Sequence, residues 1–341
     1  MDNILAVQQR LIPDLIEKMY RRFNILSTIY QFQPIGRRAL SEQLNLTERV
    51  LRTEVNILKD GYLIEIHSKG MTVTSDGEDV LEQLSHYLKS YGNLSAIGRQ
   101  LKEMYRLKKV MVVKGNADDD STAADKLGSE ASRCLREILV PGVVVTVTGG
   151  STMASVSKHL TPMPFEVKFT PARGGLGEHL QQQANSIVAS MAAKTDGTYE
   201  VLYVPDLVSD STYHSLLKEP AVSKVLQQVK SAEVVIHGIG DAMKMAERRS
   251  TSPDIKKLLI DKQAVGEAFG YYFDKSGNII HKVRTIGLQL EDLPAKQHII
   301  AVSGGRSKAE AIEAYLRIAP EQTILITDEA VASYLLKVKS L

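Results

Sequence analysis

Short apolar runs alternate with longer helix-forming segments from residue 109 to the end of the chain. The runs at 143–147, 234–237 and 298–302 have the length and composition of buried strands. Parallel strands need a crossover between them, which is usually a helix. The alternation therefore predicts an α/β fold, a doubly wound and mainly parallel sheet with helices on both faces, over residues 108–341.

Other elements of this region are predicted in the same way. Strands are expected at 110–113, 167–170, 201–204, 268–273, 279–284 and 323–326, and a hairpin turn at 275–278. Helices are expected at 122–139, from 151 to 160, between Gly175 and Ala193, and in the segments that end the chain.

Residues 1–88 have a different pattern, in which helices precede a hairpin. Apolar spacing predicts a helix over 11–30 and shorter helices over 37–44 and 48–59, with Thr47 as the N-cap of the last one. Two short runs on either side of Ser68-Lys69-Gly70 predict a strand, a tight turn and a strand. This order is typical of a winged helix-turn-helix DNA-binding domain.

The second short helix of such a domain enters the major groove, where Arg and Asn side chains read base edges. Residues 21–59 hold seven Lys and Arg against three Glu, a net charge of +4 in a chain whose total is +2. A helical scaffold with a solvated polar face would carry similar residues, but the wing that follows favours DNA binding. The candidate DNA contacts are Arg37, Arg38, Thr47, Arg49, Arg52, Thr53, Asn56 and Lys69.

Residues 89–107 are predicted to form a helical linker between the two domains. Apolar residues recur at helical spacing before and after Gly92-Asn93, where a break is expected, and they include Leu101 and Met104. This stripe fits either helix pairing between the subunits of a homo-oligomer, a dimer or tetramer, or packing on the chain's own domains.

Three loops with glycine pairs follow predicted strands. Glycine lets backbone N–H groups approach an anion, a helix N-terminus adds partial positive charge, and Arg or Lys pairs with phosphate. Parallel strands end at one edge of a sheet, so the loops together predict a pocket for an anionic ligand. Glycine in a tight turn also has purely steric uses, and the sequence contains neither GxxxxGK[ST] nor GxGxxG. The candidate ligand contacts in these loops are Gly149, Gly150, Ser151, Thr152, Arg173, Arg306 and Lys308.

An enzyme is the alternative interpretation. Asp241 and Glu267, at loop ends, could transfer protons on a sugar phosphate, as in a sugar-phosphate isomerase or deaminase with an accessory nucleic-acid-binding module. Their simpler roles are a helix N-cap and a hydroxyl acceptor, and His237 ends an apolar strand as a packed residue. No two His residues have helical metal-ligand spacing, so no metal site is expected. No cofactor is expected either.

Location is predicted from what the sequence lacks. Residues 138–157 carry no charge, but their Pro and Gly indicate strand, loop and helix rather than a membrane span. The first residues lack the basic and apolar regions of a signal peptide. With Cys134 as its single cysteine, the chain is expected to be cytoplasmic.

Several motifs together resemble the SorC family of bacterial transcriptional regulators, and these motifs are TGGST, ARGG, GIGDA, GEAFGYYFD and VSGGRSKAEAI. The resemblance covers nearly the whole chain. It implies an effector domain related in fold to glucosamine-phosphate deaminase and ribose-phosphate isomerase. It also implies a repressor of glycolytic genes that binds operator DNA and is induced by a phosphorylated sugar, fructose-1,6-bisphosphate or a related phosphosugar.

The resemblance also assigns roles to residues. It implies that the GGST loop and Arg173 hold one phosphate and that Arg306 and Lys308 serve the other end of the ligand. Gln183 would assist, Glu267 would accept sugar hydroxyls, and Arg249 or its neighbour Arg248 would lie nearby. The related enzymes use a carboxylate and a His in catalysis. This sequence has no dependable match for that pair, so no catalytic residue is expected.

Overall fold

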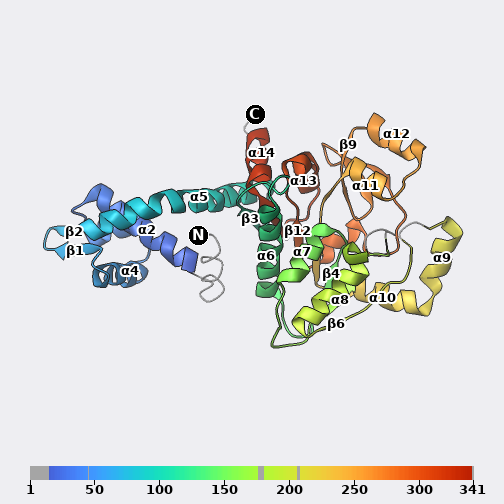
Figure 1. The fold of residues 1–341 in the computed structure, drawn as a ribbon, viewed down its shortest axis with the longest axis horizontal. Helices are drawn as coiled ribbons and strands as arrows, with labels where there is room; N and C mark the ends of the chain where they lie inside the picture. The colour runs from blue at the N-terminus through green and yellow to red at the C-terminus, as the bar shows by residue number, and fades with distance from the viewer. Residues whose placement is uncertain (1–14, 45, 176–179, 206–207, 340–341) are drawn as a thin grey trace. The chain divides into compact units, whose positions relative to one another are not determined.

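The computed structural model describes residues 15–44, 46–175, 180–205 and 208–339. The chain divides into two compact units, residues 1–93 and 94–341 (Figure 1).

Helices and a two-stranded hairpin form the first unit. Helices α2 (Leu15–Phe32), α3 (Arg37–Leu44) and α4 (Glu48–Asp60) precede the antiparallel strands β1 (Ile64–His67) and β2 (Gly70–Val73). Their apolar faces meet in one core, and Thr47 caps α4 as predicted, accepting from the Val50 N–H. The winged helix-turn-helix arrangement is therefore confirmed. Residues 11–14 of the predicted first helix lie outside the described residues.

Helix α5 (Ser75–Tyr105) continues through Gly92 and Asn93, where the sequence predicted a break. Leu101 and Tyr105, near its end, belong to the core of the second unit. This part of the apolar stripe therefore packs on the chain's own domain, one of the two alternatives that the sequence left open.

A seven-stranded sheet lies at the centre of the second unit. Its order is β3-β13-β12-β7-β4-β5-β6, and every neighbouring pair is parallel. Its strands are β3 (Lys109–Val113), β4 (Val144–Val147), β5 (Lys168–Pro171), β6 (Thr198–Tyr199), β7 (Val234–His237), β12 (His298–Val302) and β13 (Thr323–Asp328).

Alternate residues of the central strands face two different cores. Ile236, Ile300 and Ile326 pack on one side, whereas their neighbours Val235 and Leu325 pack on the other. The first side is covered by α6 (Ser121–Ile138), α7 (Ser151–His159) and α8 (Ala184–Thr195), which follow one another across the sheet (Figure 1). The second side is covered by α10 (Pro220–Ser231), α13 (Ala309–Leu316), α14 (Glu329–Lys339) and the end of α5. The predicted doubly wound fold is confirmed, since both faces are buried.

A smaller antiparallel sheet, β11-β10-β9-β8, lies beside the large one, and the sequence predicted only its hairpin of β10 and β11. Its strands are β8 (Gly240–Asp241), β9 (Ala264–Ala268), β10 (Tyr271–Asp274) and β11 (Ile279–Lys282). The range 268–273, predicted as one strand, is divided between the end of β9 and most of β10. Phe269 and Gly270 have positive φ values of 54° and 88° and turn the chain between β9 and β10. The predicted hairpin around 275–278 is present between β10 and β11.

The strand predicted over 201–204 is also wrong. The Asn185 side chain takes the backbone groups that a neighbouring strand would need, because its Oδ1 accepts from the Leu202 N–H at 3.0 Å and its Nδ2 donates to the Leu202 carbonyl at 3.1 Å. The helix predicted from Gly175 onward begins only at Ala184, after the short turn η1 (Leu180–Gln182), and residues 176–179 lie outside the described part.

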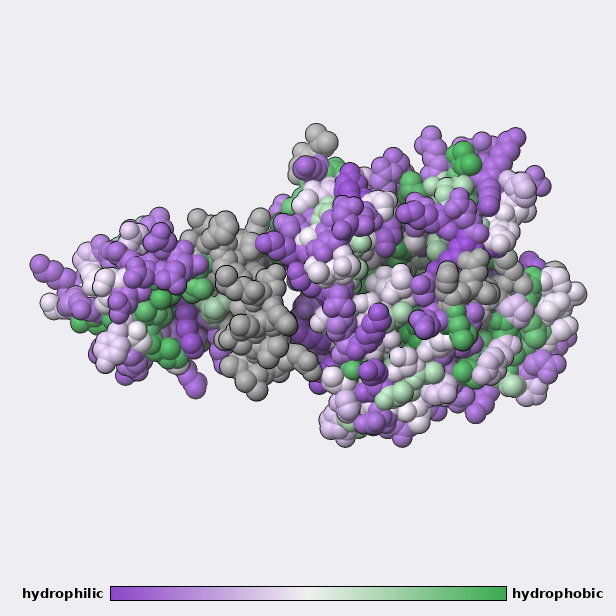
Figure 2. Space-filling model, in the orientation of Figure 1, coloured by the Kyte–Doolittle hydropathy of each residue, from purple (hydrophilic) through white to green (hydrophobic). Residues whose placement is uncertain are grey.

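The remaining elements connect the layers. They are α9 (Asp210–Lys218), α11 (Ala242–Arg248), α12 (Pro253–Asp261), η2 (Leu290–Ala295) and η3 (Arg306–Lys308). Hydrophilic side chains cover much of the surface drawn in Figure 2, with smaller hydrophobic areas between them. Within the described ranges, no helix combines the length and apolar composition that crossing a bilayer requires.

Candidate functional site

The predicted ligand loops follow neighbouring strands of the large sheet. Strands β12, β7, β4 and β5 are adjacent and parallel, so the segments after them leave from the same edge. Adjacent loops touch, since the Gly238 N–H after β7 donates to Thr148 Oγ1 after β4 at 3.3 Å. This edge is where ligands bind in open parallel sheets.

The GGST loop presents backbone amides at the start of α7. Gly150 is the N-cap with a φ of 119°, and no side chain caps this helix. The Gly150 N–H donates to the Gln182 carbonyl oxygen at 2.8 Å. The amides of Ser151 and Thr152 fall in the first helical turn, whose N–H groups have no acceptor within the helix. Together with the positive end of the helix dipole, they can bind an anion.

Two glutamines and an arginine lie next to this loop. Arg248 Nη2 is 3.4 Å from Gln182 Oε1. Gln183 Oε1 lies beside Gly175 of the ARGG segment, 3.5 Å from the position that a Cβ would take there. Gln182 was not predicted, and only the turn η1, which the sequence did not indicate, brings it to the GGST loop.

Arg249 and Glu267 form a buried ion pair beside Arg173. Arg249 Nη2 donates to Glu267 Oε1 at 2.8 Å, and Arg249 Nη1 donates to the Tyr272 hydroxyl at 3.0 Å. Arg173 Nη1 lies 3.7 Å from the same carboxylate oxygen. Burial acts to raise the pKa of Glu267, but the charges of Arg249 and Arg173 outweigh it and lower the pKa below its ordinary value. Glu267 is therefore ionised at neutral pH.

The two neighbouring arginines thus have different surroundings. Arg249 is 3% exposed and its guanidinium contacts Glu267 and Tyr272. Arg248 is partly exposed and its guanidinium lies beside the turn that supports the GGST loop. The sequence could not separate their roles, because both are charged residues at the end of one short helix.

The GGRSK loop differs from the GGST loop, because side chains of the same chain accept its amide hydrogens. The N–H groups of three consecutive residues donate to oxygens of three other residues. The pairs are Gly305 to Asp328 Oδ2 at 2.6 Å, Arg306 to Asn116 Oδ1 at 3.0 Å, and Ser307 to Asp118 Oδ2 at 2.7 Å. The Ser307 hydroxyl also donates to Asp118 Oδ1, at 2.8 Å.

The two cations of this loop lie in different environments. Arg306 is exposed, and its guanidinium carbon stands 4.3 Å from the ring centre of Tyr334. Lys308 is half-buried, and burial lowers the pKa of its ammonium group although Asp118 and Asp328 act in the opposite direction. A further anion beside Lys308 would stabilise its charged form.

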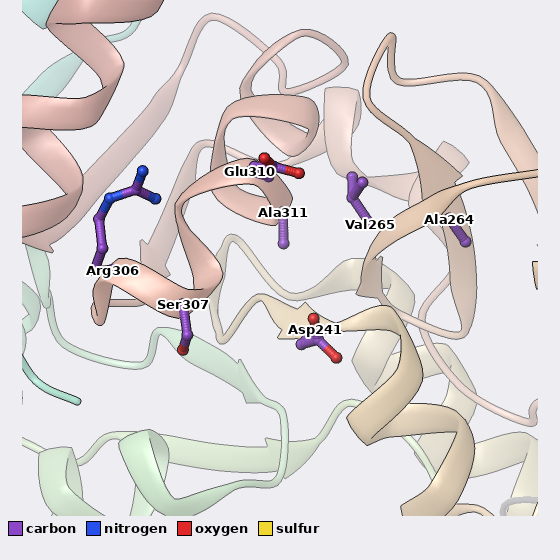
Figure 3. Close-up of a pocket in the computed structure, with 7 residues that line it drawn as sticks. All are labelled: Asp241, Ala264, Val265, Arg306, Ser307, Glu310 and Ala311. Atoms are coloured by element: carbon purple, nitrogen blue, oxygen red, sulfur yellow. The ribbon is translucent and has the colours of Figure 1, made fainter. Parts of the chain in front are cut away.

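A cavity of about 420 Å³ opens next to this loop (Figure 3). Among the predicted ligand residues, Arg306 alone lines it, and Figure 3 shows the Arg306 side chain extending away from Asp241. Glu310, on the cavity wall, pairs with Lys275 at 3.1 Å. The other lining residues are Asp241, Ala264, Val265, Ser307 and Ala311. The cavity therefore offers no set of cations for a phosphate, in contrast to the loops.

The residues weighed for catalysis have structural roles. His237 is fully buried, its Nε2 lies 2.9 Å from the Tyr315 hydroxyl, and burial lowers its pKa to about 4. Asp241 caps α11, accepting from the Lys244 N–H at 2.9 Å. Both agree with the simpler roles that the sequence suggested, a packed His and a helix cap.

The residues predicted to contact DNA are all exposed. They lie on α3, on α4 with its N-cap, and in the turn between β1 and β2. On the opposite side of α4, the buried Glu54 accepts from Arg22 Nε at 2.8 Å and so ties α4 to α2. The polar face of α4 therefore points to solvent, as a recognition helix requires.

Comparisons with known proteins agree with the division of the chain. Residues 18–88 match the family model "CggR N-terminal DNA binding domain", and residues 89–337 match "Putative sugar-binding domain".

Relatives match the chain along nearly its whole length. A protein named "Central glycolytic genes regulator" from Priestia megaterium is 46% identical over 341 residues, with 99% of both chains covered. A protein of the same name from Bacillus subtilis is 44% identical over 339 residues, again with 99% of both covered. A crystal structure of a "putative SorC family transcriptional regulator" from Enterococcus faecalis is 41% identical with a TM-score of 0.67, covering 71% of this chain and 99% of that chain.

Proposed function

Because the chain belongs to the SorC family of transcriptional regulators, we propose that it represses glycolytic genes and releases operator DNA when a phosphorylated sugar binds. The observation that carries the ligand part is the GGST loop, where α7 begins without a side-chain cap beside Arg248. The exposed polar face of α4 supports the DNA part. The named regulators of Priestia megaterium and Bacillus subtilis support glycolytic genes as the target.

Fructose-1,6-bisphosphate is the effector that we propose, and related phosphosugars share its chemistry. One phosphate would accept hydrogen bonds from the amides and hydroxyls of Ser151 and Thr152, at the positive end of α7. Arg173, two residues after the end of β5, would pair with the ligand near this phosphate. The second phosphate would lie toward Arg306 and Lys308, which follow β12.

Sugar hydroxyls need polar partners between the two phosphates. Glu267 is ionised, and the hydrogen bonds described for it engage Oε1, so Oε2 would accept a hydroxyl. Gln183 lies beside the ARGG segment and would donate or accept there. Of the neighbouring arginines, we assign the ligand contact to Arg248, because the Arg249 guanidinium already binds Glu267 and Tyr272.

Regulation would follow from linkage between the two binding events. A ligand that prefers one arrangement of the subunits shifts the population of forms able to bind DNA, and a coupling of about 1–3 kcal/mol gives a useful switch. The working form would be a homo-oligomer, a dimer or tetramer, on an operator with repeated half-sites. Helix α5 contributes side chains to both cores and is the proposed transmitter.

A thermal-shift panel followed by gel shifts tests this function. Fructose-1,6-bisphosphate is expected to raise the melting temperature more than fructose 6-phosphate, fructose or phosphate, since a ligand at 100 times its Kd adds about 2.7 kcal/mol. It should also weaken binding to a promoter fragment of a glycolytic operon at fixed salt. If no phosphosugar changed either the melting temperature or the DNA affinity, the proposal would be wrong.

A further inference from the structure

The two glycine-rich loops have similar sequences, but their backbone amides differ in whether side chains accept from them. In the GGST loop, the first-turn amides of α7 have no side-chain cap. In the GGRSK loop, the amides of Gly305, Arg306 and Ser307 each donate to a side-chain oxygen of Asp328, Asn116 or Asp118. Successive backbone N–H groups in a turn can form an anion-binding concavity. Here that concavity is filled by the protein itself.

We propose that Asp118 is a built-in competitor for the anionic ligand, occupying the place on Ser307 that a phosphate group takes when it binds. The Asp118 carboxylate accepts from both the N–H and the hydroxyl of Ser307, at 2.7 and 2.8 Å. These are the donors that a phosphate oxygen would use. Binding of a phosphate at this loop therefore requires Asp118, in the segment between β3 and α6, to leave Ser307.

Asp118 is the carboxylate that can leave, whereas Asp328 is fixed. Asp328 is fully buried and accepts N–H groups from Gly305, Ala117 and Val331 at 2.6 to 3.0 Å. Removing it from the site would leave two buried donors and one half-buried donor without their acceptor. Asp118 is exposed, and its carboxylate can exchange protein donors for water at small cost.

The charges around Asp118 fit an exchange of one anion for another. Burial acts to raise the pKa of Asp118, but the hydrogen bonds from Ser307 and the charges of Lys308 and Lys244 lower it below the ordinary value. Asp118 is therefore an anion where it stands. When it leaves, Lys308 and Lys244 lose their nearby counter-charge, which favours a phosphate in its place. Lys244, in the first turn of α11, thereby joins the candidate ligand contacts.

The inference rests on the proposed function for the identity of the ligand, so its test uses inorganic phosphate as the probe. Phosphate binding to the full-length protein is measured by equilibrium dialysis at constant ionic strength. If the loop is open for about a tenth of the time, Asp118→Ala should bind phosphate about tenfold more tightly there, because the competitor is gone. Adding Lys308→Ala to Asp118→Ala should abolish the gain, which locates it at this loop.

Asp119→Asn is the matched control, because it removes one negative charge from the same segment while Asp119 contacts Asn116 and not Ser307. It should tighten phosphate binding by less than twofold. Asp118→Asn keeps one acceptor oxygen, so its gain in phosphate affinity should be smaller than that of Asp118→Ala. It provides a second test variant if Asp118→Ala folds poorly.

Equal phosphate affinity in Asp118→Ala and Asp119→Asn, or a gain that survives Lys308→Ala, would overturn the inference. These results do not depend on the sugar. If no phosphosugar bound the wild-type chain while Asp118→Ala still gained phosphate affinity, the proposed effector would fail and the role of Asp118 would stand.

Discussion

The guanidinium of Arg249 and the carboxylate of Glu267 meet at 2.8 Å, with side-chain exposures of 0% and 6%. A buried pair of this kind joins α11 to β9, so that the end of the short helix is held against the smaller sheet. Removing one partner of such a pair leaves a buried charge without compensation, which is far more costly than replacing both.

Arg249→Ala should therefore lower the free energy of unfolding by about 3 kcal/mol or more, because Glu267 would lose its main counter-charge and Tyr272 a hydrogen bond. Urea denaturation followed by circular dichroism measures this. Arg249→Met combined with Glu267→Leu should cost less than Arg249→Ala. A stability for Arg249→Ala within 1 kcal/mol of wild type would contradict a structural role for Arg249 (the threshold is about the size of one net hydrogen bond).

In contrast to Arg249→Ala, Arg248→Ala should weaken ligand binding and change the free energy of unfolding little. Loss of a charged hydrogen bond to a phosphate costs about 1.5–3 kcal/mol, or roughly tenfold or more in Kd. Calorimetric titration with fructose-1,6-bisphosphate measures the loss, and Arg317→Ala, on the far end of α13, serves as a charge-matched control. Wild-type affinity in Arg248→Ala would remove this residue from the site.

His237 should make the protein less stable as the pH falls. Its pKa is lowered from 6.5 to about 4 by burial, so the folded chain binds this proton only near pH 4 whereas the unfolded chain binds it near 6.5. Unfolding therefore takes up a proton between these values, and stability falls as the pH decreases from about 6.5 to 4.

His237→Gln removes this contribution while keeping a neutral polar side chain. The stability advantage of wild type over His237→Gln, measured by urea denaturation at several pH values, should be largest near pH 7 and should shrink toward pH 4.5. A constant difference over this range would show that His237 does not titrate as its buried position predicts.

Arg52→Ala should weaken operator binding by about 1–3 kcal/mol if the side chain reads a base edge from the exposed face of α4. Gel shifts with specific and unrelated DNA at one salt concentration separate a base contact from a phosphate contact. Arg136→Ala, an exposed arginine on α6, carries the same change of charge and should bind DNA as wild type does. Equal losses on both DNAs would instead assign Arg52 to the phosphate backbone.

The sequence predicted the parallel sheet well because its signals are local. Each buried strand is a short apolar run, as at 234–237 and 298–302, and helix-forming segments separate these runs along the sequence. The winged helix-turn-helix was predicted for the same reason, down to the Thr47 cap. The errors arise where residues distant in the sequence, or a turn, determine the conformation of the backbone. The backbone of Leu202 is taken by Asn185, and the turn at Phe269-Gly270 interrupts a sequence with strong strand propensity.

The candidate site was predictable at the level of loops and not of side chains. Gly149 to Thr152 and Gly304 to Lys308 follow strands, and strand order then brings them to one edge. Arg248 and Arg249 differ in how deeply they are buried. This difference depends on tertiary packing and cannot be predicted from the adjacent residues of the sequence. The capture of Ser307 by Asp118 joins residues 189 positions apart, and nothing in the acidic run at 118–120 indicates it.

The approach of Gly149 to the Gln182 carbonyl has a practical consequence. A Cβ at position 149 would stand 2.8 Å from that oxygen, which belongs to the backbone and cannot rotate aside. One added methyl group would therefore push η1 away from α7 and distort the GGST loop, whereas α4 belongs to the other compact unit and would keep its exposed face. We therefore expect Gly149→Ala to lose binding of the proposed effector while keeping binding to the proposed operator.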